Sequence, residues 1–292
     1  MKQALNNIRW CATLALLLEA SSFKPGNVSP YFEREERFEH YLASSVAIGD
    51  MLSLAKDLSV GELVYKATKR MLEVQRGGNT HLGAIILIAP LAKAYASLGR
   101  RVSIASFRQE VEEVIARADY RDSLYYYEAI RIAKPAGLTD VERLDVRNKG
   151  TRTQIIRGKI PLLEFMKPGV AGPYINLVCY EYVTGYQISF EDSLPLFLQM
   201  LDKFESIRRA VTALSVHLLA RYLDNMIIGL FGKSFAEELQ RKAIEALADG
   251  DEMRAAGKLH NFLSANKANP GAIADIVAST LFIYLLMEAP PI

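Results

Sequence analysis

The chain has 292 residues, of which 50% are hydrophobic and 23% charged, and its formal net charge is +2 at pH 7. A chain of this length and composition can bury a large core, and we expect one domain over residues 1–292. The charge is nearly balanced and forms no block of like sign, which argues against nucleic-acid binding.

The cysteines and the N-terminal residues give information about the cellular location of the protein. Cys11 and Cys179 lie far apart among apolar neighbours, which favours reduced core thiols and a cytoplasmic protein. Basic residues before the apolar run 11–18 are also typical of a signal peptide. Glu19 interrupts the expected cleavage region, and the run has helical spacing, so a first core helix is the preferred interpretation.

Helical periodicity dominates the chain and predicts an all-α fold, a single compact bundle of about twelve helices. No convincing strand remains, and neither a repeat nor a long linker is visible. The apolar runs 82–92 and 276–287 fall short of the roughly 20 residues of a membrane span. The predicted segments lie near 2–22, 37–57, 60–76, 80–98, 103–119, 122–133, 152–167, 174–184, 190–202, 203–223, 233–266 in two pieces, and 270–288.

The first candidate site follows the first predicted helix, in Glu19-Ala-Ser-Ser-Phe-Lys24-Pro25-Gly26-Asn27. Proline restricts the backbone, while glycine and asparagine tolerate left-handed conformations. Such a turn can hold the Lys24 ammonium in one place. Pro-Gly also commonly follows the end of a helix, so a purely structural turn remains an alternative.

The second candidate is Arg76-Gly-Gly-Asn79-Thr80-His81-Leu-Gly83, before an apolar helix. Asn79 or Thr80 is suited to cap that helix, whose first amides and dipole would attract an anion. His81, expected in the first turn, could donate to a phosphate or act as an acid. Plain capping with a satisfied histidine is the alternative.

The third candidate opens the last apolar helix, in Asn269-Pro270-Gly271-Ala-Ile-Ala-Asp275. We expect Asn269 as the cap and Pro270 at the first helical position, while Gly271 permits close approach of a ligand. Asp275 faces an otherwise apolar helix, where a carboxylate needs a partner such as a lysine or a metal. An acidic residue favoured by the helix dipole is the structural alternative.

Weaker candidates lie between these motifs. Asp224-Asn225 precedes an apolar run and indicates either a buried polar site or a simple helix stop. Arg131, Asp145 and Glu181 lie in and around the central loop, where each could equally form an ordinary ion pair.

Taken in order, these motifs resemble those of the triphosphoribosyl-dephospho-CoA synthase family over nearly the whole chain. The resemblance rests mainly on Lys24-Pro25-Gly26-Asn27 and Asn79-Thr80-His81-x-Gly83. It implies an all-helical pentosyltransferase that moves the triphosphoribosyl group of ATP to 3'-dephospho-CoA and releases adenine.

The resemblance also implies roles for the motif residues, with Mg²⁺ and ATP at one site. Metal ligands would be Glu19, Asp224 and Asp275, because magnesium prefers hard oxygen ligands. Asp224 and Asp275 could stabilise positive charge on the sugar or take the proton of the attacking hydroxyl, and His81 could protonate adenine or contact phosphate. ATP would be bound by Lys24, Gly26, Asn27, Asn79, Thr80, Gly83, Asn269 and Gly271.

Two departures from the family pattern leave alternatives open. No arginine follows Asp224-Asn225, where only Lys233 offers a positive charge, and the expected central Gly-x-Arg-Gly-Glu motif has no clear match. A nucleotide N-glycosidic hydrolase and a non-catalytic nucleotide-binding protein are the competing functions. An exposed apolar helix face could mediate a homodimer, but periodicity assigns no interface.

Overall fold

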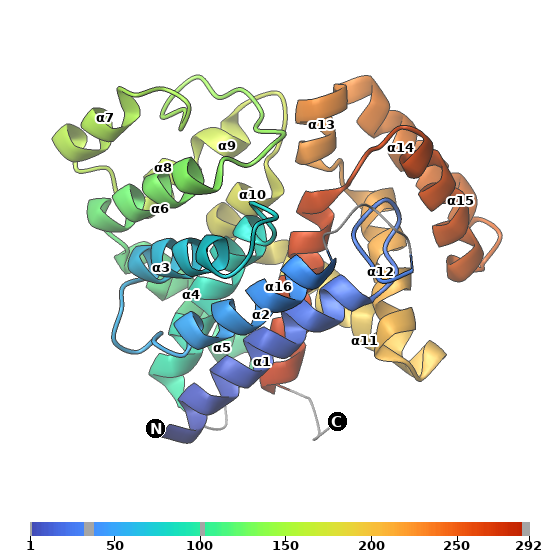
Figure 1. Cartoon of the computed structure of the whole chain (residues 1–292), viewed down its shortest axis with the longest axis horizontal. Coiled ribbons are helices and arrows are strands. Elements are labelled where there is room, and N and C mark those ends of the chain that lie inside the picture. Colours follow the sequence, from blue (N-terminus) through green and yellow to red (C-terminus); the bar gives the residue numbers. More distant parts are fainter. Residues whose placement is uncertain (1, 32–37, 100–102, 288–292) are drawn as a thin grey trace.

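The structure is a computed structural model, described for residues 2–31, 38–99 and 103–287 (Figure 1). These residues form α-helices and one π-helical segment, η1, with no strand among them. The elements are α1 Lys2–Ser21, α2 Phe38–Leu52, α3 Val60–Glu73, α4 Leu82–Leu98, α5 Ile104–Arg117, α6 Tyr120–Ala133, α7 Thr151–Gly158, α8 Leu162–Met166, α9 Pro168–Ala171, α10 Leu177–Thr184, η1 Ile188–Ser193, α11 Leu194–Phe204, α12 Ile207–Arg221, α13 Asn225–Phe231, α14 Lys233–Leu247, α15 Glu252–Ala265 and α16 Gly271–Met287.

The all-α prediction is confirmed, although the described residues hold more helices than about twelve. The segment predicted at 152–167 is divided into α7 and α8. Lys159 takes a left-handed conformation at the end of α7, and Pro161 then precedes α8. The apolar run after Asp224-Asn225 forms a helix of its own, α13.

Helix α16 lies at the centre of the bundle (Figure 1). It packs against α1, α4 and α12, and it is buried on nearly every side because almost all of its residues are apolar. Helix α4 is the other strongly apolar helix and packs against α16. No described helix has the combined length and apolarity of a membrane span.

A proline inside α4 is compensated by tyrosines. Pro90 has no N–H, so the carbonyl of Ile86, four residues earlier, loses its helical partner. The buried hydroxyl of Tyr182 donates to that carbonyl at 2.7 Å, and the hydroxyl of Tyr186 donates to the carbonyl of Leu87 at 2.6 Å. Tyr182 therefore replaces the donor that Pro90 lacks, and Tyr186 donates to the next carbonyl of α4.

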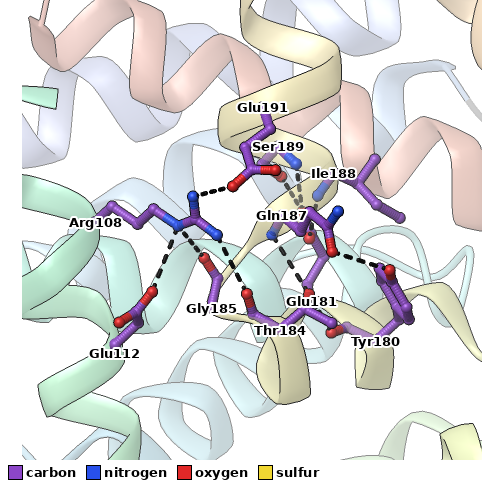
Figure 2. A network of polar contacts seen from close by, with 10 residues as sticks. All are labelled: Arg108, Glu112, Tyr180, Glu181, Thr184, Gly185, Gln187, Ile188, Ser189 and Glu191. Atoms are coloured by element: carbon purple, nitrogen blue, oxygen red, sulfur yellow. Dashed lines mark hydrogen bonds and ion pairs between the residues drawn. The ribbon is translucent and has the colours of Figure 1, made fainter. Parts of the chain in front are cut away.

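A buried carboxylate joins α10 to η1 (Figure 2). Glu181 accepts hydrogen bonds from the backbone N–H groups of Ile188 at 2.9 Å and Ser189 at 2.8 Å, and from the Ser189 hydroxyl. Arg108 donates to the carbonyl of Gly185 at 2.9 Å, at the end of α10. Burial raises the pKa of Glu181 to about 7, although these hydrogen bonds oppose the shift.

The raised pKa of Glu181 predicts a specific pH dependence of stability. Because the folded pKa of about 7 exceeds the ordinary value of 4.5, folding favours the protonated acid. The protonated Glu181 side chain contributes fully to the free energy of unfolding below pH 4.5, and this contribution is lost as the pH rises through 7. Relative to Glu181→Gln, the wild-type free energy of unfolding should therefore fall by on the order of 3 kcal/mol over this range. Urea denaturation at several pH values measures this, and a constant difference would contradict it.

Candidate active site

A buried ion pair follows α1. The Nζ of Lys24 lies 2.9 Å from Oε1 of Glu19, and both side chains are almost fully buried. Lys24 also donates to the carbonyls of Glu19 and Ser22, the latter at 3.3 Å. An ammonium has three N–H groups, so all of them have partners, and the cation stabilises the carboxyl end of α1.

The turn after Lys24 packs against the end of α15. Gly26 has φ of +70°, and a Cβ there would lie 2.8 Å from the carbonyl oxygen of Ala268. Its N–H donates to Nδ1 of His260 at 3.4 Å, and buried Asn27 accepts from Val28 at 2.7 Å. Glycine is therefore required here both for its conformation and for the close approach.

Asp224 ties two helix starts together. Its Oδ1 accepts from the N–H of Ile227 in α13 at 3.0 Å, and its Oδ2 accepts from Ile273 in α16 at 2.9 Å. The neighbouring Asn225 accepts from Leu177, at the start of α10, at 3.0 Å. Burial raises the pKa of Asp224 to about 6, against the effect of its backbone donors.

Asp275, one turn into α16, lies against the first turn of α4. The absence of a side chain at Gly83 leaves room for its carboxylate, since a Cβ there would overlap Oδ2. The pKa of Asp275 is raised well above its ordinary range, first by burial and then by the negative charges of Glu19 and Asp224, while the Ala84 N–H opposes the shift. The motifs of α1, α4, α13 and α16 thus meet at one place.

The start of α4 carries the Asn79-Thr80-His81 motif. Asn79 accepts from the N–H of Leu82 at 3.0 Å, as expected of a capping side chain. His81 precedes the helix rather than lying in its first turn. Burial and the charge of Lys24 lower the pKa of His81 to about 3, so its imidazole is neutral.

The start of α16 differs in detail from the sequence-based expectation. The helix begins at Gly271, so Pro270 precedes the first helical residue. The Oδ1 of Asn269 has no hydrogen-bond partner and does not cap the helix, whose Ile273 N–H donates to Asp224. A Cβ on Gly271 would lie 2.5 Å from Sδ of Met226. Gly271 is therefore needed for packing against α13.

We call the place where these motifs meet the carboxylate site. It consists of Glu19, Lys24, Asp224 and Asp275. One paired ammonium accompanies three carboxyl groups, so a cation would relieve their mutual repulsion. Among the described residues, however, no three His, Cys, Asp or Glu side chains are grouped as around one metal ion. A small cavity next to the site is lined by Lys24, Pro25, Asn27, Ser215, Leu219, Pro270, Ile273 and Ala274.

The remaining candidates have other partners. Arg131 donates to the hydroxyl of Tyr127 at 3.2 Å, and Asp145 binds Arg147 at 3.0 Å. Glu181 stabilises η1, as described above. Sequence reasoning missed Ser44, whose hydroxyl lies 2.8 Å from that of Thr80, because nothing local marks a serine inside α2.

Substitution of Gly83 tests the contact between α4 and α16. Gly83→Ala should lower the free energy of unfolding by about 1–3 kcal/mol, because the new methyl group displaces the Asp275 carboxylate. Gly257→Ala in α15 is the matched control, since its Cβ meets nothing within 4 Å and alanine favours the helix. Thermal and urea unfolding measure both variants. If both variants were stabilised equally, the Asp275 carboxylate would be able to move away from the new methyl group at no cost.

Comparisons with known proteins show the family of the chain. The family model described as ATP:dephospho-CoA triphosphoribosyl transferase matches residues 5–291. A crystal structure from Archaeoglobus fulgidus, provisionally named a triphosphoribosyl-dephospho-CoA synthase, is similar with a TM-score of 0.65 and 29% identity. The similarity covers 84% of this chain and 97% of that one. No curated protein matches the chain. Because the family model spans nearly the whole sequence, the chain belongs to the ATP:dephospho-CoA triphosphoribosyl transferase family.

Proposed function

We propose that the carboxylate site transfers the triphosphoribosyl group of magnesium-bound ATP to 3'-dephospho-CoA and releases adenine. The transferase activity and its two substrates are those of the family. The observation that carries the assignment to this site is Asp275, a carboxylate held between two other acids at the meeting of four motif-bearing segments. Its surroundings favour a ligand that brings positive charge.

The helix starts support triphosphate binding nearby. Helices α4 and α16 both begin at the site, and their dipoles favour a bound anion. Asn79, Thr80 and Gly83 would form the α4 side of the nucleotide site, and Asn269 and Gly271 the α16 side. Lys24, Gly26 and Asn27 would complete it from the turn after α1.

Magnesium would be held between Asp275 and phosphate oxygens, with Glu19 and Asp224 nearby. This arrangement fits the surplus of buried negative charge and needs no cage of three protein ligands. When bound, the ion shields the triphosphate and keeps it intact. Glu19 retains Lys24 as its partner, and Asp224 retains its two backbone donors.

The reaction breaks an N-glycosidic bond, so positive charge develops on the ribose. Asp275 would stabilise this charge, because a preformed carboxylate in a site with little water interacts strongly with a developing cation. Asp224 would add negative charge and keep the starts of α13 and α16 together. His81 would lie against the reacting groups at the start of α4.

We also propose a cytoplasmic location and a single functional domain. The thiols Cys11 and Cys179 form no disulfide, which supports a reducing compartment. The proposal includes a homodimer, and light scattering would measure the oligomeric state.

The direct test is chromatographic detection of adenine from ATP and magnesium, with and without 3'-dephospho-CoA. We expect adenine only when the acceptor is present. Asp275→Asn should lower the turnover by about 10²–10³-fold. Adenine in both mixtures would instead indicate a hydrolase, and none in either, from folded protein that binds ATP, would indicate a nucleotide-binding protein.

Lys24→Met should weaken the binding of ATP by about tenfold or more while changing adenosine binding little, if the ammonium acts on the phosphates. The substitution also leaves Glu19 buried without its cation. Lys24→Met with Glu19→Gln is therefore the matched control for charge balance. Calorimetric titration measures both ligands, and equal weakening of ATP and adenosine would contradict a phosphate contact.

A further inference from the structure

A chain of three polar side chains fixes the orientation of His81. The hydroxyl of Thr80 donates to the Ser44 hydroxyl at 2.8 Å, and Ser44 is fully buried in α2. Nδ1 of His81 lies 3.2 Å from the same Thr80 oxygen. Because the Thr80 proton is directed to Ser44, the Thr80 oxygen offers a lone pair, and Nδ1 of His81 is the nitrogen that carries the hydrogen.

The other ring nitrogen is left as an acceptor. Nε2 of His81 is buried and has no hydrogen-bond partner. The ring is also held by an edge contact with Tyr41, with 4.7 Å between the ring centroids. A buried acceptor without a donor is costly, so its retention indicates that a ligand supplies the donor.

The carboxylates are poorly placed for the same task. Both oxygens of Asp224 accept backbone hydrogen bonds, and Glu19 is paired with Lys24. In the proposed function the carboxylate of Asp275 faces magnesium, which would occupy it. His81 Nε2 is thus the uncommitted proton acceptor among these four groups.

We propose that Nε2 of His81 accepts the proton of the attacking hydroxyl of 3'-dephospho-CoA, and that Thr80 and Ser44 are positioning residues that hold the required tautomer. This inference rests on the proposed function. The hydroxyl oxygen forms a bond to C1' of the ribose, and the C1'–N9 bond breaks with its electron pair going to adenine. The hydroxyl proton passes to Nε2, and the imidazolium then returns it to a ring nitrogen of adenine, so charge and atoms balance.

The triphosphate makes this role compatible with the neutral imidazole of the free protein. Burial, and then the charge of Lys24, disfavour a proton on His81 in the absence of ligand by lowering its pKa. Bound phosphates bring several negative charges next to Lys24 and offset its effect. His81 would therefore accept a proton more readily when the nucleotide is in place than in the free protein.

The first arm of the test is nitrogen-15 NMR of the full-length protein with labelled histidine, in which His81→Gln identifies the His81 signals among the four histidines. We expect the hydrogen on Nδ1 in the wild type and in Thr80→Ser. Thr80→Val and Ser44→Ala should shift the population towards a hydrogen on Nε2. A wild-type hydrogen on Nε2 would overturn the proposal whether or not adenine is released.

The second arm is turnover with ATP and 3'-dephospho-CoA. Thr80→Val should lower kcat by about tenfold or more, and Thr80→Ser should restore it. His81→Gln keeps an acceptor but cannot carry the proton, so kcat should fall by about 10²–10⁴-fold. Near-normal kcat in His81→Gln, or equal kcat in the valine and serine variants, would overturn the proposal.

A buried threonine elsewhere provides the control for folding. Thr68 in α3 is fully buried and its hydroxyl has no partner, so Thr68→Val makes the same chemical change away from His81. It should leave turnover and the His81 tautomer unchanged. If the wild type releases no adenine at all, the proposed function fails, while the NMR arm still decides the His81 arrangement.

Discussion

The structure depends on the burial of α16 against α1, α4 and α12. A helix that is apolar on nearly every side can be stable only when neighbours cover it completely, and this requirement places its own start deep in the protein. Asp275, one turn into α16, nevertheless lies in this packed region. The central packing of the fold and the polarity of the site are therefore two aspects of one arrangement.

Buried acids at this place are stabilised by helix starts. Asp224 accepts from N–H groups of α13 and α16, and the Ala84 N–H of α4 interacts with Asp275. These donors offset part of the desolvation cost, but the pKa of both acids remains raised. Such surroundings favour a ligand that brings positive charge, which the magnesium ion of the proposed substrate would supply.

Some polar groups elsewhere in the core have partners from other elements. Tyr182 satisfies the Ile86 carbonyl that Pro90 leaves without a helical donor, Tyr186 donates to the Leu87 carbonyl, and Glu181 accepts from N–H groups of η1. At the carboxylate site, Nε2 of His81 and Oδ1 of Asn269 lack partners. Unsatisfied groups cost stability, so their presence at a candidate active site favours a functional reason.

The sequence by itself determined the helical class, the apolar character of α4 and α16, and the motifs at Lys24, Asn79 and Asp275, because these follow from local periodicity and turn chemistry. Only the tertiary structure decided that the motifs meet and which hydrogen bonds and ion pairs their side chains form. The Lys24 ammonium is occupied by α1, and His81 receives its tautomer from Ser44 in another helix. Such pairings join residues distant in sequence, and no local pattern encodes the contacts that burial imposes on them.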